Sequence, residues 1–169
     1  MLSFLVNWLR ALFFIKKNGI EFGRQLIVVD GHGAQITPPI YMGRQCKIYA
    51  GGGVEIGQGA IFSDEVVVLT TMHDFHDEDY IPYGPKNIKK PVVIGEACWI
   101  GYRSMILPGV VLGKGVIVGA GSVVTRSFPD GSIVAGNPAK IIGQRDSSNL
   151  CKNKKTVYLV EKIKKGRGA

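Results

Sequence analysis

The sequence predicts an all-β fold in which short parallel strands wind into stacked triangular coils. From residue 94 onward an aliphatic residue recurs at every sixth position, at Ile94, Ile100, Ile106, Leu112, Val118 and Val124. Four positions after each of them comes a mostly small residue, at Cys98, Ser104, Val110, Val116 and Ser122, and then at Phe128. A period of six fits neither an α-helix nor a strand whose side chains alternate every two residues.

Each hexad predicts one short strand that ends in a bend. Three such strands make a coil of roughly 18 residues, and coils stack about 4.8 Å apart by parallel pairing. Four of the six hexads from residue 94 carry Gly in second place, which we expect to supply backbone freedom at the bends. A weaker block, IGQGAI-FSDEVV-VLTTMH, begins at Ile56 in a different phase, and the stretch LTTMHDFHDEDY interrupts the rhythm between the blocks.

Length, charge and cysteine content limit the class of protein. With 169 residues and 46% hydrophobic residues, the chain is expected to form one domain with a real core. The net charge is +8, but residues 145–169 carry +6 of it and residues 1–144 only +2, so no nucleic-acid surface is expected. The three cysteines, at distant spacings, fit a reducing compartment, which predicts a cytoplasmic protein.

Three segments are expected along the chain. Residues 1–18 predict an amphipathic helix, about 21 Å long from Leu2 to Ile15, which is too short to cross the roughly 30 Å apolar core of a bilayer. We expect it to cap the domain or, through residues 1–17, to contact the inner face of the membrane peripherally. Residues 19–143 predict the coiled domain, with an inserted loop at 73–92, and residues 144–169 a basic tail.

Four features of the chain carry a family resemblance, namely the hexads, the HD of the loop, the following WIG and the segment VGAGSVVTRSFPDGSIVAGNPAKII. In these features the chain resembles the hexapeptide-repeat acyltransferases. The similarity spans roughly residues 40–143 and points to the branch of maltose/galactoside and lipopolysaccharide/capsule O-acetyltransferases. It implies a left-handed parallel β-helix, an exception to the right-handed crossover rule. It also implies a homotrimer with active sites between subunits, acetyl-CoA as co-substrate, a carbohydrate acceptor and no metal.

His73 is the candidate general base, because imidazole is suited to taking a proton from an acceptor hydroxyl and the family's catalytic histidine matches it. Asp74 either orients His73 or caps the turn, and His76 is expected near the acceptor. The alternative is a metal site, since His73 and His76 stand three residues apart and four nearby acids could add oxygen ligands, namely Asp74, Asp77, Glu78 and Asp79.

The resemblance assigns further residues to the acyl group and to the cofactor. A backbone N–H in the Gly101–Tyr102 region would bind the developing oxyanion, and Trp99 either shapes the acyl pocket or is simply a packed aromatic residue. The expected cofactor contacts are Gly119, Ala120, Thr125, Arg126 and Lys140. Cys98 falls at an inward position and is expected to be core rather than a nucleophile.

The sequence therefore predicts an acetyl-CoA-dependent O-acetyltransferase that transfers the acetyl group directly to a sugar hydroxyl in a ternary complex. The region YMGRQCKIYAGGG lacks the asparagine with which the maltose and galactoside branch holds its sugar, which favours a polysaccharide or lipopolysaccharide precursor as acceptor. The alternatives are N-acetylation of an amino sugar or of a xenobiotic on the same scaffold, and a non-catalytic or metal-binding β-helix trimer.

Overall fold

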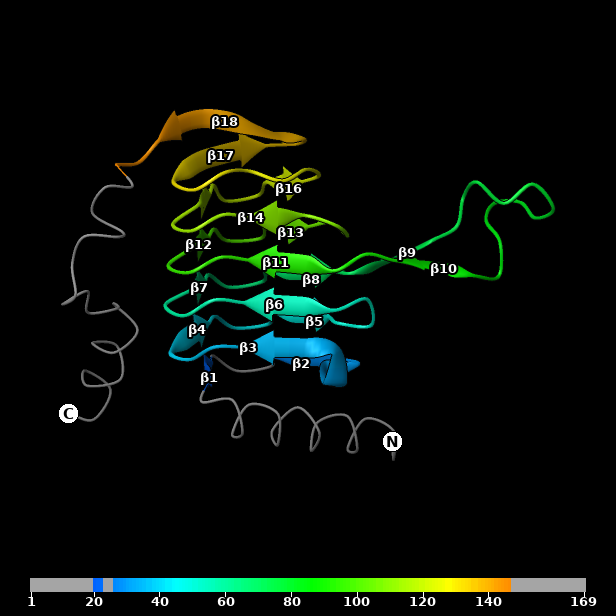
Figure 1. The fold of residues 1–169 in the computed structure, drawn as a ribbon, viewed down its shortest axis with the longest axis horizontal. Coiled ribbons are helices and arrows are strands. Elements are labelled where there is room, and N and C mark those ends of the chain that lie inside the picture. Colours follow the sequence, from blue (N-terminus) through cyan, green and yellow to red (C-terminus); the bar gives the residue numbers. More distant parts are fainter. Residues whose placement is uncertain (1–19, 23–25, 147–169) are drawn as a thin grey trace.

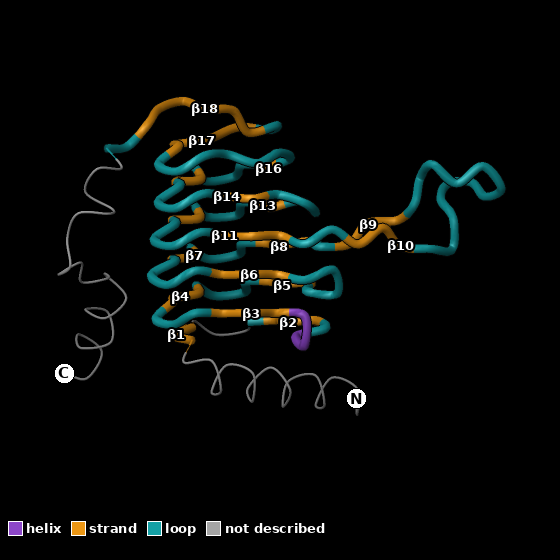
Figure 2. Tube along the Cα trace, in the orientation of Figure 1, coloured by secondary structure: helices purple, strands orange, loops and turns teal. Residues whose placement is uncertain are grey.

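The computed structural model describes residues 20–22 and 26–146, with side chains from residue 26 onward. In these residues short strands wind into a column of stacked coils, so the predicted all-β coil is confirmed (Figure 1). The turns between the strands line up along the column (Figure 2). The helix expected at residues 1–18 and most of the basic tail lie outside the described residues.

Three parallel sheets form the three faces of the column. Face A contains β1 (Ile20–Phe22), β4 (Ile40–Met42), β7 (Ile61–Phe62), β12 (Trp99–Ile100), β15 (Ile117–Val118), β17 (Ser132–Gly136) and β18 (Ala139–Gln144). Face B contains β2 (Ile27–Val29), β5 (Lys47–Tyr49), β8 (Val67–Leu69), β13 (Met105–Ile106) and β16 (Val123–Val124). Face C contains β3 (Ala34–Ile36), β6 (Val54–Ile56), β11 (Val92–Ile94) and β14 (Val111–Leu112). The last pair, β17 and β18, is antiparallel and closes the top of the column.

The chain visits the faces in the order A, B, C, so turns of one kind stack along one edge of the column. The AB edge is formed by residues 43–46, 63–66, 101–104 and 119–122. The BC edge is formed by residues 30–33, 50–53, 70–91, 107–110 and 125–127, and its first turn is a 3-10 helix, η1 (Gly31–Gly33). No helix in the described part of the chain is long and apolar enough to cross a membrane.

Every inward position of the six-residue rhythm is buried. The aliphatic members are at most 1% exposed, namely Ile94, Ile100, Ile106, Leu112, Val118 and Val124. The residues four places later are at most 4% exposed, namely Cys98, Ser104, Val110, Val116, Ser122 and Phe128. The small positions include buried hydroxyls, and these are satisfied by backbone groups. For example, Ser104 Oγ donates to the carbonyls of Gly101 (2.7 Å) and Gly119 (3.1 Å). The period of six is therefore the period of the core.

The glycines in second place of the hexads serve a different purpose from the one expected. A Cβ on Gly101 would lie 2.6 Å from the Val118 carbonyl oxygen of the coil above, so glycine is needed there for close stacking. The left-handed turn positions are shared between glycines such as Gly115 (φ 67°) and side-chain-bearing residues such as Glu65 (φ 62°) and Arg103 (φ 55°). Coil spacing, more than backbone freedom, explains the repeated glycine.

The inserted segment leaves the column as an antiparallel ribbon. Strand β9 (Thr71–His73) pairs with β10 (Asn87–Lys89), and the connecting residues project far beyond the BC edge (Figure 1). The buried Thr70 anchors the start of the ribbon, because its Oγ1 donates to the Tyr49 carbonyl (2.6 Å) and accepts the Gly52 N–H (2.8 Å). The loop thus begins from a fixed point on the coil below.

Cys46 and Cys98 are core residues, as expected for Cys98. Both thiols are buried and donate to carbonyls, Cys46 to Ser63 (3.2 Å) and Cys98 to Gly113 (3.1 Å). Burial raises the pKa of Cys98 to about 12 and the pKa of Cys46 to about 11. Since the thiolate is the reactive form, neither residue is a nucleophile at neutral pH.

Replacing Leu112 by Ala should lower the free energy of unfolding by about 2–5 kcal/mol, because a fully buried side chain is lost and the stacked coils close the cavity only partly. The neighbouring Val111→Ala is the matched control: Val111 is 45% exposed, so the expected cost is about 0.5 kcal/mol or less. Denaturant titration at one fixed protein concentration measures both. Equal losses in the two variants would contradict an inward Leu112.

Cys46 and Cys98 should resist alkylation by iodoacetamide at pH 8 in the native protein and react fully in denaturant, because both thiols are buried and protonated. Peptide mass spectrometry after timed labelling measures the modified fraction at each position. Native-state labelling of Cys98 at the denatured rate would show that the interior of the column opens readily.

Candidate active site

His73 lies at the root of the ribbon, where β9 has just left face B. It pairs with Asn87 of β10, and its side chain is exposed. The imidazole stacks face to face on the ring of Tyr83, with the centroids 3.9 Å apart and the planes 6° from parallel. An exposed imidazole on a fixed strand, beside a long loop, suits a group that exchanges protons with a bound ligand.

Asp74 caps a turn rather than contacting His73. Its Oδ1 accepts the backbone N–H of His76 at 3.1 Å, which decides between the two roles expected for this carboxylate. The ring of His76 packs against Phe75 (centroids 4.2 Å apart), and both side chains are exposed on the loop.

The loop acids do not gather around the histidines. Asp77 Oδ1 accepts the N–H of Asp79 at 3.0 Å, which forms a second turn further along the loop. In the described residues no three His, Cys, Asp or Glu side chains are grouped closely enough to hold a metal ion. His32 is exposed in η1, on the same BC edge as His73 but two coils below it.

Trp99, Gly101 and Tyr102 lie on face A and the AB edge. Trp99 is 51% exposed on the outer surface of face A, and its Nε1 donates to Ser63 Oγ at 3.3 Å. The N–H of Gly101 donates to the Val118 carbonyl at 2.8 Å, so it is not free to bind an oxyanion. The N–H of Tyr102 has no acceptor within the described chain, which leaves it as the available donor of this pair.

Gly119 and Ala120 lie one coil above Gly101 and Tyr102 on the same edge. A Cβ on Gly119 would come within 2.9 Å of the Ala135 Cβ, so this position has room only for glycine. Ala120 is exposed, and its N–H, like that of Tyr102, meets no acceptor in residues 26–146. The AB edge therefore presents two backbone donors in consecutive coils next to small residues.

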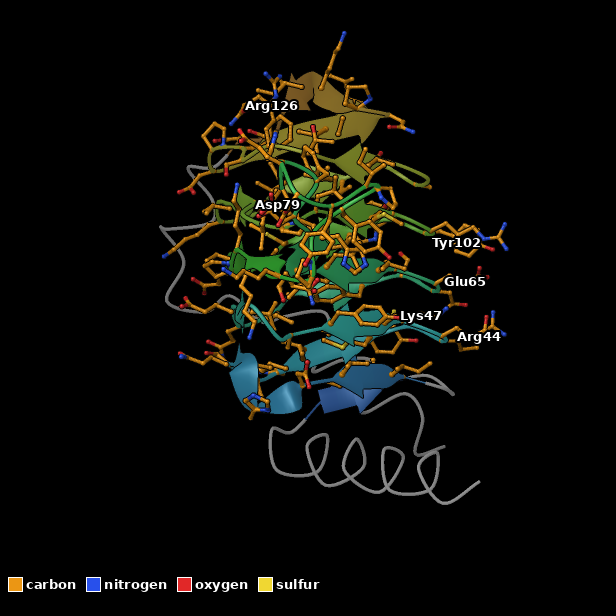
Figure 3. All side chains as sticks on the ribbon, turned by 90° about the vertical axis from the view of Figure 1, so that its right-hand side faces the viewer. Arg44, Lys47, Glu65, Asp79, Tyr102 and Arg126 are labelled. Carbon is orange, nitrogen blue, oxygen red and sulfur yellow. The ribbon has the colours of Figure 1, made fainter. Side chains whose placement is uncertain are left out.

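A row of charged and polar side chains from consecutive coils, which we call the charged ladder, runs along the AB edge from Tyr102 down to Arg44. Arg44 Nε donates to Asp64 Oδ2 (2.8 Å), while Arg103 Nε (2.7 Å) and the Tyr102 hydroxyl (2.9 Å) both donate to Glu65. Arg44, Glu65 and Tyr102 stand above one another in Figure 3. The hydrogen bonds from Arg103 and then Tyr102 lower the pKa of Glu65. Sequence reasoning missed this ladder, because Glu65 and Arg103 are 38 positions apart and no local pattern links them.

Thr125 and Arg126 lie on the BC edge, the same edge as His73 but above it. Both are exposed, and the Arg126 guanidinium sits 5.3 Å from the centre of the Phe128 ring. Lys140 is exposed on β18, opposite Ala135. Arg145, a further basic residue that follows β18, donates through its guanidinium to the Gly115 carbonyl at 3.2 Å.

Within one chain the expected site residues form two groups. His73, Thr125 and Arg126 follow face B at the BC edge, whereas Tyr102 and Ala120 precede it at the AB edge. Figure 3 shows this division, with Tyr102 and Arg126 on different sides of the column. A single chain therefore separates the candidate base from the candidate oxyanion donors.

Comparison with known proteins agrees with this architecture. Residues 91–126 match the family described as bacterial transferase hexapeptide (six repeats). The "Putative colanic acid biosynthesis acetyltransferase WcaF" of Escherichia coli K12 is 30% identical over 149 residues, which cover 83% of this chain and 77% of that protein. The galactoside O-acetyltransferase of the same organism is 28% identical over 133 residues, covering 70% of this chain and 64% of that protein.

A solved structure shows the same fold. The maltose O-acetyltransferase from Clostridium difficile 630 superposes with a TM-score of 0.69 at 26% identity, covering 75% of this chain and 67% of that chain. The column is thus the left-handed parallel β-helix expected from the resemblance. By its repeat, its fold and these relatives, the chain belongs to the hexapeptide-repeat acyltransferases, and it is an enzyme of the acetyltransferase type.

Proposed function

We propose that this protein transfers the acetyl group of acetyl-CoA to a hydroxyl group of a sugar, with His73 as general base. The observation that carries the proposal is the exposed His73 at a fixed strand end, together with two free backbone donors, Tyr102 N–H and Ala120 N–H, on the other edge of the same face. These are the two functions that acyl transfer to a hydroxyl requires: a base, and a site for the oxyanion.

The reaction proceeds by direct transfer in a ternary complex. His73 takes the proton from the acceptor hydroxyl as its oxygen attacks the thioester carbonyl, and the carbonyl oxygen gains negative charge. The N–H of Tyr102 donates to that oxygen. When the tetrahedral intermediate collapses, the carbon–sulfur bond breaks and the CoA thiolate takes the proton from His73. The products are the O-acetylated sugar and free CoA.

The division of the site supports a homotrimer as the active form. The outer surface of face B is mainly apolar, with Ile27, Val29, Tyr49, Val67, Leu69, Met105 and Val123 pointing outward around Lys47. If three copies turn this face toward a common axis, the AB edge of each copy meets the BC edge of the next. That arrangement joins Tyr102 and Ala120 of one subunit to His73 of its neighbour.

Small and basic residues support the position of the cofactor. Gly119 and Ala120 let the pantetheine arm approach the backbone along the AB edge. Thr125 and Arg126 are exposed on the neighbouring BC edge, and Lys140 is exposed on β18. These residues suit the phosphates of the cofactor, because arginine and lysine bind phosphate by charge-assisted hydrogen bonds. Trp99, half exposed beside the AB edge, borders the acyl group.

The acceptor is a sugar of a polysaccharide or lipopolysaccharide precursor. Relatives whose names refer to colanic acid and lipopolysaccharide biosynthesis support this class. His76 lies on the exposed loop beyond His73, where it would meet the acceptor. Peripheral membrane contact through residues 1–17, in the cytoplasm, suits a lipid-linked precursor and stays a prediction, since those residues lie outside the described part of the chain.

His73→Ala should lower kcat about 10²- to 10⁴-fold, the usual cost of losing a general base. Release of free CoA is measured over a panel of sugars and nucleotide sugars, with His32→Ala as the matched control, since His32 is also exposed on the BC edge. Hydroxylamine lability of the product distinguishes an ester from the amide that N-acetylation would form. Unchanged turnover of His73→Ala with an unchanged oligomer would refute the role of this base.

Mixed trimers should regain activity from two inactive chains. His73→Ala removes the base at the BC edge, and Ala120→Trp blocks the AB edge of an otherwise intact chain. In random mixtures about one quarter of the interfaces pair an intact base with an intact AB edge, so about one quarter of wild-type CoA release is expected. The chain carrying both substitutions serves as the inactive control. No recovery in confirmed mixed trimers would mean that the site forms within one chain.

A further inference from the structure

The ring of Tyr83 contacts the imidazole ring of His73, and the geometry is that of a face-to-face stack. The centroids are 3.9 Å apart and the planes differ by 6°. Oδ1 of the nearest carboxylate in sequence, that of Asp74, accepts the N–H of His76, and in the described residues no hydrogen bond joins this carboxylate to His73. Neither imidazole nitrogen has a hydrogen-bond partner in residues 26–146. A neighbouring aromatic face, rather than an acid, therefore determines how this imidazole is oriented.

Backbone contacts at the neck of the loop hold Tyr83 in this position. The N–H of Gly84 donates to the Asp74 carbonyl at 2.8 Å, and the N–H of Asp74 donates to the Lys86 carbonyl at 3.3 Å. Gly84 is buried, and a Cβ there would collide with the side chain of Asp77. The residues next to Tyr83 and next to His73 are thus bonded directly to each other, so the stack is built into the neck of the loop.

A stacked tyrosine suits the proton cycle of a base. Contact through the ring faces leaves both nitrogens of His73 at the ring edge, where one can meet an acceptor hydroxyl. When the imidazole takes the proton it becomes a cation, and the electron-rich face of an aromatic ring attracts a cation placed over it. The same stack also restricts rotation of the imidazole, which keeps the reactive nitrogen in one orientation.

We propose that Tyr83 is a positioning residue of the acetyl transfer, which orients His73 by stacking on its imidazole ring. This inference rests on the proposed function, because it assumes that His73 is the base. It requires the aromatic ring of Tyr83 and not its hydroxyl. It also separates Tyr83 from Tyr80, an exposed aromatic residue of the same loop whose ring contacts no other aromatic ring in the described residues.

Three variants test this with CoA release. Tyr83→Leu removes the aromatic face and should lower kcat about 3- to 30-fold, with the KM for acetyl-CoA changed less than about twofold. Tyr83→Phe keeps the face and should retain wild-type kcat. Tyr80→Leu is the matched control on the same loop and should also retain it. Wild-type kcat in Tyr83→Leu, or an equal loss in Tyr83→Phe, would overturn the inference.

Nuclear magnetic resonance gives a readout that does not depend on turnover. The chain has three histidines, so ring-labelled protein gives few imidazole signals, and His73→Ala assigns the one of interest. The ring current of Tyr83 should shift the His73 protons upfield in the wild type and in Tyr83→Phe, and Tyr83→Leu should abolish this shift. An unchanged His73 signal in Tyr83→Leu overturns the stack even where the enzyme turns over. A shift that is lost without any fall in kcat overturns the positioning role.

The two experiments separate failure of the inference from failure of the proposed function. A wild type with the shifted His73 signal but without CoA release over the acceptor panel would contradict the proposed function, and the catalytic role of Tyr83 would fall with it. A wild type that releases CoA in a His73-dependent way, while Tyr83→Leu keeps its kcat, would contradict the role of Tyr83 alone.

Discussion

Parallel hydrogen bonds between consecutive coils hold this molecule together, and they require each turn of the chain to lie directly over the turn below. The N–H of Ser63 reaches the Ile100 carbonyl, that of Gly101 the Val118 carbonyl and that of Gly119 the Val134 carbonyl, all at 2.8–2.9 Å. This close stacking explains why positions 101 and 119 must be glycine, since a Cβ at either would meet the coil above. It also aligns turns of one kind into edges, which is where the chemistry of the molecule is found.

Because the edges are separate, one chain divides the groups to which we assign the proposed acyl transfer. The AB edge offers the N–H groups of Tyr102 and Ala120, and the BC edge offers His73 and Arg126. Face B lies between the two edges and presents apolar side chains such as Met105 and Val123 to the outside. In the proposed homotrimer this face would drive assembly, and the same face would set which edges meet.

The inserted loop contributes what a regular column lacks, a side chain held away from the coil surface. The ribbon of β9 and β10 starts at the buried Thr70, and its neck is closed by the hydrogen bond between Gly84 and Asp74. His73 is consequently fixed at its backbone while its ring faces the solvent beside Tyr83. The rest of the loop extends into the solvent, with the side chains of Phe75, Tyr80 and Ile81 exposed.

The sequence by itself determined the coil, its inward residues and the place of the insertion, because burial repeats every six residues and leaves a periodic mark. Through the family resemblance it also singled out His73, Tyr102 and Ala120 as candidate site residues, and their roles stay predictions. Only the tertiary structure decided what those residues do with their hydrogen bonds. The N–H of Gly101 proved to donate to the Val118 carbonyl of the coil above, Asp74 proved to cap a turn, and Glu65 proved to bind Arg103 across one coil. The pairings of Gly101 and Glu65 join residues far apart in the chain and follow from the stacking of the coils. The contact of Asp74 depends on the local course of the loop. Neither kind leaves a periodic pattern in the sequence.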